Sequence, residues 1–238
     1  NEICANCHNN PFGGPGSQIV IRFGCDDKGS FTELEHLGGS LLQSQSIDPD
    51  NCQEVIPDDA NRQSFRVTPG SLGYGLIEAI PDADLIALEQ SPPGISGRAN
   101  LVKLLEDPMG PDRVGRFGWK AQIATMLSFA GDAAAMEMGL TNRLIPEEQD
   151  PNGILPPDIL DCDDYADPED GPDENGLHFI DRVTDFQRYL AQPPQTPRSG
   201  MIGETIFMQI GCGDCHTPSF TTSNDAGLED PIRNQTIR

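Results

Sequence analysis

Two short cysteine motifs stand near opposite ends of the sequence, and a histidine follows each of them directly. Both read C-x-x-C-H; the first comprises Cys4, Cys7 and His8, and the second comprises Cys212, Cys215 and His216. Two cysteines at this spacing at the start of a helix can each form a thioether to a haem vinyl group, which brings the adjacent imidazole under the iron. The motifs therefore predict two covalently attached c-type haems with His8 and His216 as axial iron ligands.

Other uses of paired C-x-x-C motifs explain the sequence less well. A zinc site built from the four motif thiolates is the reasonable alternative, but it leaves the two matched histidines without a role. A thioredoxin-like redox motif would need a βαβ context, and a disulfide framework is typical of smaller chains. The di-haem interpretation is favoured because it accounts for all six residues.

Three further cysteines, Cys25, Cys52 and Cys162, lie in sequence rich in Asp and Gly. A disulfide between two of them, either Cys25 with Cys52 or Cys52 with Cys162, would leave one free thiol in an oxidising compartment. No catalytic role is assigned to them.

The charge balance limits the classes of partner. The chain has 15 Lys+Arg against 38 Asp+Glu, a formal net charge of −23, which argues against a nucleic-acid-binding surface. It favours docking of a small basic redox protein, such as a cytochrome, as electron donor, although adaptation to a salty medium would give the same composition. No apolar run approaches the roughly 20 residues that a membrane span needs.

The elements that position these motifs are expected to be short helices joined by long loops, because 25 Gly and 21 Pro occur in 238 residues. Residues 9–66 are expected to be mostly irregular, with a short strand at Ile19–Ile21. The capping and apolar spacing predict helices at 82–89, from Trp119 to Gly139, at 179–190 and at 201–210. The expected fold class is mostly α and loop-rich, with two cytochrome c-like lobes, each around one covalently bound haem. The expected regions are an N-terminal lobe at 1–145, an acidic surface loop at 146–176 and the start of a C-terminal lobe at 177–238.

Several other residues could bind metal. His36 is a candidate sixth ligand of the first haem, but a loop-packing histidine is the favoured interpretation, and His178 is expected to be structural. The methionines at 109, 126 and 138 are candidate thioether ligands whose default role is core packing. The acidic segment 161–174 is a candidate calcium site, but its spacing does not match an EF-hand, and a solvated acidic face is favoured.

With the haem motifs placed, the chain resembles the di-haem oxidoreductase family of peroxidases, which are relatives of bacterial di-haem cytochrome c peroxidase and of MauG-type enzymes. The matching segments are Gly73–Pro81, Gly94–Asn100, Gly115–Ala121 and Met138–Thr141. Together with both haem motifs they cover most of residues 1–220. The segment Gly115–Ala121 is the specific one.

The resemblance implies an enzyme that reduces hydrogen peroxide at the N-terminal haem with electrons from the C-terminal haem. Relatives place a tryptophan between the haems, which here looks like Trp119, the only tryptophan. They also place a glutamate followed by a methionine on the peroxide side, which here looks like Glu137 and Met138. Glu137 would then be the acid–base group. The alternatives are a solvated carboxylate at the end of a helix for Glu137 and an ordinary core indole for Trp119. The rival interpretation is an electron-transfer cytochrome with two six-coordinate irons.

The sequence departs from the family pattern in two places. Relatives commonly have a glutamine about ten residues past the tryptophan, where this chain has Ser128 and Phe129. The family also continues beyond its second haem motif, so we expect the sequence to be part of a longer polypeptide. Because covalent haem attachment takes place outside the cytoplasm, the expected location is the periplasm or cell surface of a bacterium.

Overall fold

The chain divides into two compact units, each assembled from two separate stretches of sequence. In this computed structural model, residues 1–71 and 130–183 form the first unit, and residues 72–129 and 184–238 form the second. The structure describes residues 6–11, 13–16, 18–34, 39–46, 48–50, 52–89, 94–148, 152, 171–193 and 202–237. The domain boundaries expected after residues 145 and 176 stay predictions.

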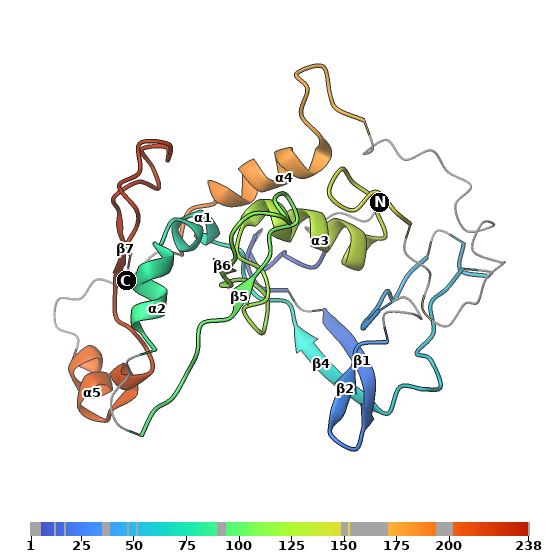
Figure 1. Ribbon diagram of the computed structural model, residues 1–238, viewed down its shortest axis with the longest axis horizontal. Coiled ribbons are helices and arrows are strands. Elements are labelled where there is room, and N and C mark those ends of the chain that lie inside the picture. Colours follow the sequence, from blue (N-terminus) through green and yellow to red (C-terminus); the bar gives the residue numbers. More distant parts are fainter. Residues whose placement is uncertain are drawn as a thin grey trace. The chain divides into compact units, whose positions relative to one another are not determined.

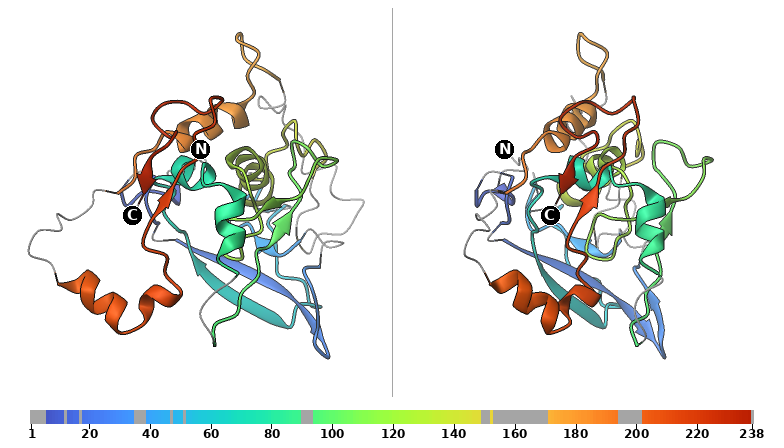
Figure 2. Two further views of the ribbon diagram at one scale, coloured as in Figure 1. Left: turned by 60° about the vertical axis from the view of Figure 1, so that its left-hand side comes forward. Right: turned by 90° about the vertical axis from the view of Figure 1, so that its left-hand side faces the viewer.

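The first unit contains a four-stranded antiparallel sheet built on the long strand β1 (Ile19–Asp27). β1 pairs with β2 (Ser30–Thr32), β3 (Leu41–Leu42) and β4 (Arg62–Val67), and the paired ribbons of β1, β2 and β4 are visible in Figures 1 and 2. The β-branched residues at the start of β1 favour an extended backbone. Phe23, which is 3% exposed, buries its ring in the core of this unit.

The long helix α3 (Met126–Met138) begins in the second unit and continues into the first. Ala130, Ala134 and Ala135 are buried within the first unit at helical spacing. The helix α4 (Phe179–Arg188) has Asp181 in its first turn and Arg188 in its last turn. Both charges are favourable for the helix dipole.

The second unit contains short helices and two small strand pairs. An aromatic cluster forms part of its core: the Phe117 ring centroid lies 5.1 Å from that of Tyr74 and 6.2 Å from that of Phe129. The remaining elements of this unit are α1 (Tyr74–Glu78), α2 (Asp82–Ala87), β5 (Leu101–Val102), β6 (Arg113–Val114), α5 (Gly203–Gln209), β7 (Phe220–Thr221) and β8 (Thr236–Ile237).

The prediction of a mostly α fold is wrong. In the described ranges the α-helices run from α1 with 5 residues to α3 with 13, and eight strands stand beside them. The physical reason is that β1 and β4, which lie almost entirely in the stretch 9–66 expected to be mostly irregular, satisfy backbone groups by pairing with each other. The described residues do not show cytochrome c-like lobes.

Several local predictions are confirmed. α2, α4 and α5 lie within the ranges predicted for helices, and α3 ends where Gly139 was expected to end it. The predicted helix start at Trp119 is wrong, because residues 117–123 form a loop. In the part of the chain that the structure describes, each helix is too short or too polar to cross a lipid bilayer.

Candidate functional site

The N-terminal motif is described at Cys7 and His8, and Cys4 lies outside the described residues. The His8 ring nitrogen Nδ1 lies 3.3 Å from the carbonyl oxygen of Gly14. That carbonyl belongs to a tight loop in which the N–H of Gly13 donates to the His8 carbonyl at 2.9 Å. A backbone acceptor at Nδ1 favours the tautomer whose Nε2 can bind a metal.

The protonation of His8 also suits an iron ligand. Burial lowers the pKa of the His8 imidazole, and the backbone carbonyls of Gly14 and Pro69 act in the opposite direction. A neutral imidazole is the form that binds a metal. The Cys7 thiol donates to Oε1 of Gln18 at 3.5 Å. The described part of this motif therefore fits a c-type haem.

The C-terminal motif follows α5 through a tight turn. Gly211, at φ +87°, leads into a 3-10 helix at Cys212–Asp214. The His216 N–H donates to the Cys212 carbonyl at 2.9 Å, so the motif winds through one helical turn. Such a turn puts side chains three and four positions apart on one face.

The side chains of this motif are accessible for haem attachment. Cys212 and Cys215 carry free thiols, and Cys215 is exposed. The His216 ring lies 5.7 Å from the Phe207 ring in an edge arrangement. Ile206 and Phe207 of α5 and Ile210 directly after it also carry exposed apolar side chains. Thiols, imidazole and apolar surface together match what a covalently attached porphyrin contacts.

Trp119 lies at the tip of a short loop in the second unit. The loop closes where Phe117 and Ile123 pair, with the Phe117 N–H donating to the Ile123 carbonyl at 2.9 Å and the Ile123 N–H donating back at 3.3 Å. Gly118, at φ +78°, adopts a conformation that other residues rarely adopt. Trp119 is half-buried there.

Neighbouring segments hold this loop from outside. The Asn100 side chain donates to the Ala121 carbonyl at 2.9 Å, and the Gly115 N–H donates to the Asn100 carbonyl at 2.8 Å. A Cβ on Gly115 would lie 1.8 Å from the Ala121 carbonyl oxygen, so only glycine allows this approach. Two of the segments quoted for the family resemblance, Gly94–Asn100 and Gly115–Ala121, therefore meet at this loop.

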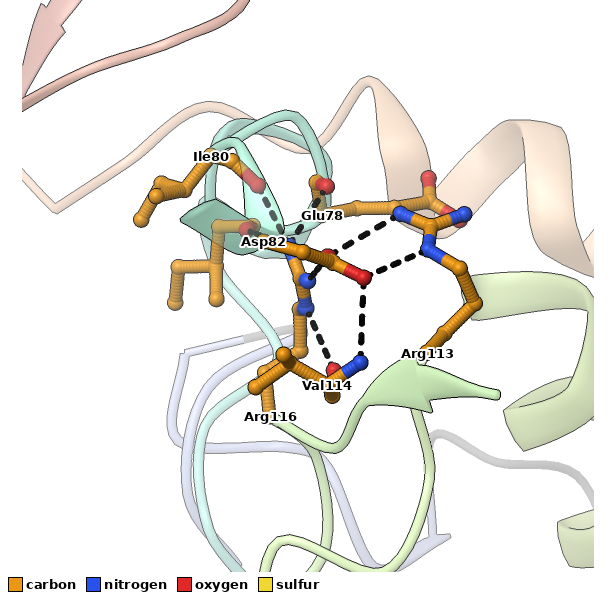
Figure 3. Close-up of polar contacts among 7 residues, drawn as sticks. Glu78, Ile80, Asp82, Arg113, Val114 and Arg116 are labelled. Atoms are coloured by element: carbon orange, nitrogen blue, oxygen red, sulfur yellow. Dashed lines mark hydrogen bonds and ion pairs between the residues drawn. The ribbon is translucent and has the colours of Figure 1, made fainter. Parts of the chain in front are cut away.

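Arg116 and Asp82 connect the loop to the first two helices of this unit (Figure 3). The Arg116 side chain is 3% exposed and pairs with Asp82, which also accepts from Arg113 Nε at 2.7 Å and from the Val114 N–H at 3.1 Å. Desolvation opposes ionisation of Asp82, but the two arginines and the Val114 N–H outweigh it and hold the pKa of that carboxyl below its ordinary value. Asp82 is therefore a carboxylate with charged partners.

Glu78, at the end of α1, joins α1 to the start of α3 and the end of α4. Its Oε1 accepts from the Met126 N–H at 2.8 Å, and its Oε2 accepts from Arg188 Nε at 2.8 Å. The pair is largely buried, with side-chain exposures of 16% for Glu78 and 25% for Arg188.

Glu137 lies near the end of α3, in the same compact unit as His8. Burial raises the pKa of its carboxyl, the negative charge of Asp132 adds to the rise, and Arg22 opposes it. Burial raises the pKa of Asp132 as well. Glu137 is nevertheless an exposed residue by its accessible surface, so water can reach it. A carboxyl of this kind can both take and return a proton closer to neutral pH than an ordinary glutamate.

The structure describes some, but not all, of the methionines and histidines considered as further metal ligands. The described methionines differ in burial: Met126 is fully buried, as core packing predicts, whereas Met109 is 93% exposed. The His178 N–H donates to Asp181 at 3.0 Å at the start of α4, which agrees with its expected structural role. His36 lies outside the described residues.

The structure excludes one of the two disulfides predicted for the remaining cysteines. Cys25 carries a free thiol and Cys52 forms a disulfide, so the pairing of these two is excluded. Cys162 lies outside the described residues. The acidic residues 161–170 proposed for calcium also lie outside them, and the described ranges contain no group of three or more His, Cys, Asp or Glu placed to hold a metal ion.

The predicted site residues fall into the two units separately. The first unit contains His8 and Glu137, and the second contains Trp119 and His216. Sequence reasoning quoted the segments around Arg116 and Glu78 but assigned these residues no role. The sequence feature that could have indicated a role was the same for both: a charged residue inside an otherwise apolar or glycine-rich motif.

Comparison with known protein families identifies the family of this chain. A family model described as "Di-haem oxidoreductase, putative peroxidase" matches residues 42–238. That range includes Trp119, Glu137 and the C-terminal haem motif. No curated protein and no solved structure matches the chain.

Proposed function

Because the chain belongs to the di-haem oxidoreductase family, we propose that it is an exported peroxidase-like enzyme that reduces hydrogen peroxide. Cys4, Cys7 and His8 would hold one haem, and the C-terminal motif Cys212, Cys215 and His216 would hold the other. A bound haem supplies an iron that can bind peroxide and pass electrons. Peroxide reduction is assigned to the N-terminal haem, and the C-terminal haem is assigned the entry of electrons.

Glu137 is the acid–base residue in this proposal; support comes from its place in the same compact unit as His8 and from the upward direction of its pKa shift. Its carboxylate would accept the proton from the oxygen of peroxide nearer the iron and return it to the leaving oxygen, so that water rather than hydroxide departs. Trp119 is assigned to the electron route, and support comes from its place in a loop that several segments hold.

The electron donor in this proposal is a small basic redox protein. The net charge of −23 supports long-range attraction of such a partner. The compartment is the periplasm or the cell surface, where covalent haem attachment takes place.

The first test is spectroscopic. Absorption and electron paramagnetic resonance spectra of the purified holoprotein are recorded oxidised and half-reduced, before and after addition of hydrogen peroxide. A high-spin ferric signal that peroxide converts to another species is expected. Two low-spin haems that peroxide leaves unchanged in both redox states would reject the enzyme and leave an electron-transfer cytochrome.

The second test is the variant Glu137→Gln. Removing the proton acceptor should lower the rate of peroxide reduction by about 10²–10⁴-fold, with both haems still attached. Asp58→Asn is the control because Asp58 is an exposed carboxyl in the same compact unit as Glu137. Equal losses in the two variants would reject the specific role of Glu137.

A further inference from the structure

Arg116 stands three residues before Trp119, and its side chain reaches back to the end of α1. The guanidinium Nη1 donates to the carbonyls of Ile77 at 3.3 Å, Glu78 at 2.9 Å and Ile80 at 2.7 Å. Carbonyls at the end of a helix lack partners within the helix, and a cation is favourable beside them. The contact therefore binds the Arg116 side chain firmly to α1.

The backbone of Arg116 forms the base of the loop that carries Trp119. Its N–H donates to the Ile123 carbonyl at 2.8 Å, next to the pair formed by Phe117 and Ile123. The same residue thus holds the loop through its backbone and holds α1 through its side chain. Figure 3 shows the guanidinium between the end of α1 and the carboxylate of Asp82.

We propose that Arg116 is the positioning residue for Trp119, because it fixes the base of the 117–123 loop to α1 through a buried guanidinium. Asp82 orients that guanidinium by accepting from Nη2. A rigid planar fork with several donors is required for this arrangement, and lysine does not supply one. The consequence for electron flow rests on the function proposed above for Trp119.

Arg113 provides a matched control within the same cluster. It pairs with the same carboxylate at 2.7 Å and its side chain is 39% exposed, against 3% for Arg116. Its guanidinium contacts Asp82, but the residue itself belongs to β6 and not to the base of the loop that carries Trp119. Arg113→Lys keeps the Asp82 pairing of Arg116 and should leave Trp119 in place.

The experiment compares Arg116→Lys with Arg113→Lys in the holoprotein. Trp119 is the only tryptophan, so the fluorescence lifetime of the protein reports its position relative to the haems, which quench it by energy transfer. The rate of electron transfer between the haems is measured after rapid reduction. Arg116→Lys should change the lifetime and lower that rate, because electron transfer slows as the separation of donor and acceptor grows.

The two measurements distinguish a failure of the positioning role of Arg116 from a failure of the proposed electron route through Trp119. An Arg116→Lys lifetime equal to that of Arg113→Lys in folded protein would overturn the proposal, even if the melting temperature fell. A changed lifetime with an unchanged electron-transfer rate would support the positioning role and reject Trp119 as the electron route. If Arg116→Lys does not fold, Asp82→Asn is measured by the same criterion, because it removes the carboxylate that orients Arg116.

Discussion

Replacing Glu78 by glutamine should lower the free energy of unfolding by about 2 kcal/mol, since hydrogen bonds to charged groups contribute roughly 1.5–3 kcal/mol. Glu78 accepts from Arg188 at 2.8 and 3.3 Å and from the Met126 N–H at 2.8 Å. A glutamine has one acceptor oxygen and one donor group. If its oxygen faces Met126, its amide nitrogen faces the donors of Arg188, and the ion pair is lost.

The burial of the pair sets this magnitude. Exposed ion pairs contribute about 0–1 kcal/mol, and breaking a fully buried pair costs about 3–5 kcal/mol. Side-chain exposures of 16% and 25% place Glu78 and Arg188 between these limits. Glu78→Ala also removes the acceptor at the start of α3, which adds about 1 kcal/mol.

Thermal unfolding of the holoprotein followed by circular dichroism tests this prediction. At about 2–4 °C per kcal/mol for a chain of this size, Glu78→Gln should lower the melting temperature by about 4–8 °C. The control is Asp112→Asn, which breaks an exposed pair with Lys103 in the same unit; those side chains are 46% and 58% exposed. Equal melting temperatures for the two variants would refute the reasoning from burial.

Two further predictions concern the site. Asp132→Asn should lower the pKa of Glu137, because the negative charge of Asp132 raises it. The acidic limb of the plot of peroxide-reduction rate against pH should therefore move to lower pH. Stopped-flow kinetics across pH test this, and an unmoved limb would show that the two carboxyls are not coupled. Cys212→Ser should remove one of the two thioethers of the C-terminal haem; mass spectrometry and a pyridine haemochrome spectrum would contradict the assignment if that haem kept two thioether links.

Local chemistry made some elements predictable from the sequence. α2 follows a proline and has acidic residues in its first turn, and these signals act within a few residues. The two C-x-x-C-H motifs were recognisable for the same reason, because covalent haem attachment requires a fixed spacing of two thiols and one imidazole. Such signals need no knowledge of distant partners.

The sheet in the first unit could not be predicted in this way. β4 (Arg62–Val67) pairs with β1 about forty positions earlier in the chain, as in the register Gly24 with Arg62. Its apolar members Phe65 and Val67 are 66% and 61% exposed. Apolar residues alternate with polar ones at the end of β4, but these apolar side chains do not lie in a core. The alternation that usually identifies a half-buried strand was therefore weak.

The roles of Arg116 and Glu78 depended on long-range contacts as well. Arg116 binds carbonyls 36 to 39 positions earlier in the chain, and Glu78 binds Arg188 110 positions later. Motif reasoning found the segments that contain these residues. It could not find their partners, because no local pattern encodes which carbonyl or carboxylate will lie nearby.

Cys212 and Cys215 bear on how the protein matures. Both are free thiols on one short turn, and two such thiols can also close into a disulfide by exchange. In an oxidising compartment that closure competes with thioether formation, and Cys25 adds another thiol that can exchange. If this motif holds a haem as proposed, the order of two events would decide the product. Attachment before oxidation would yield holoprotein, whereas oxidation before attachment would yield a disulfide-closed turn that must be reduced again. Under that proposal, a reductant that acts during assembly would be as important to the yield as the supply of haem.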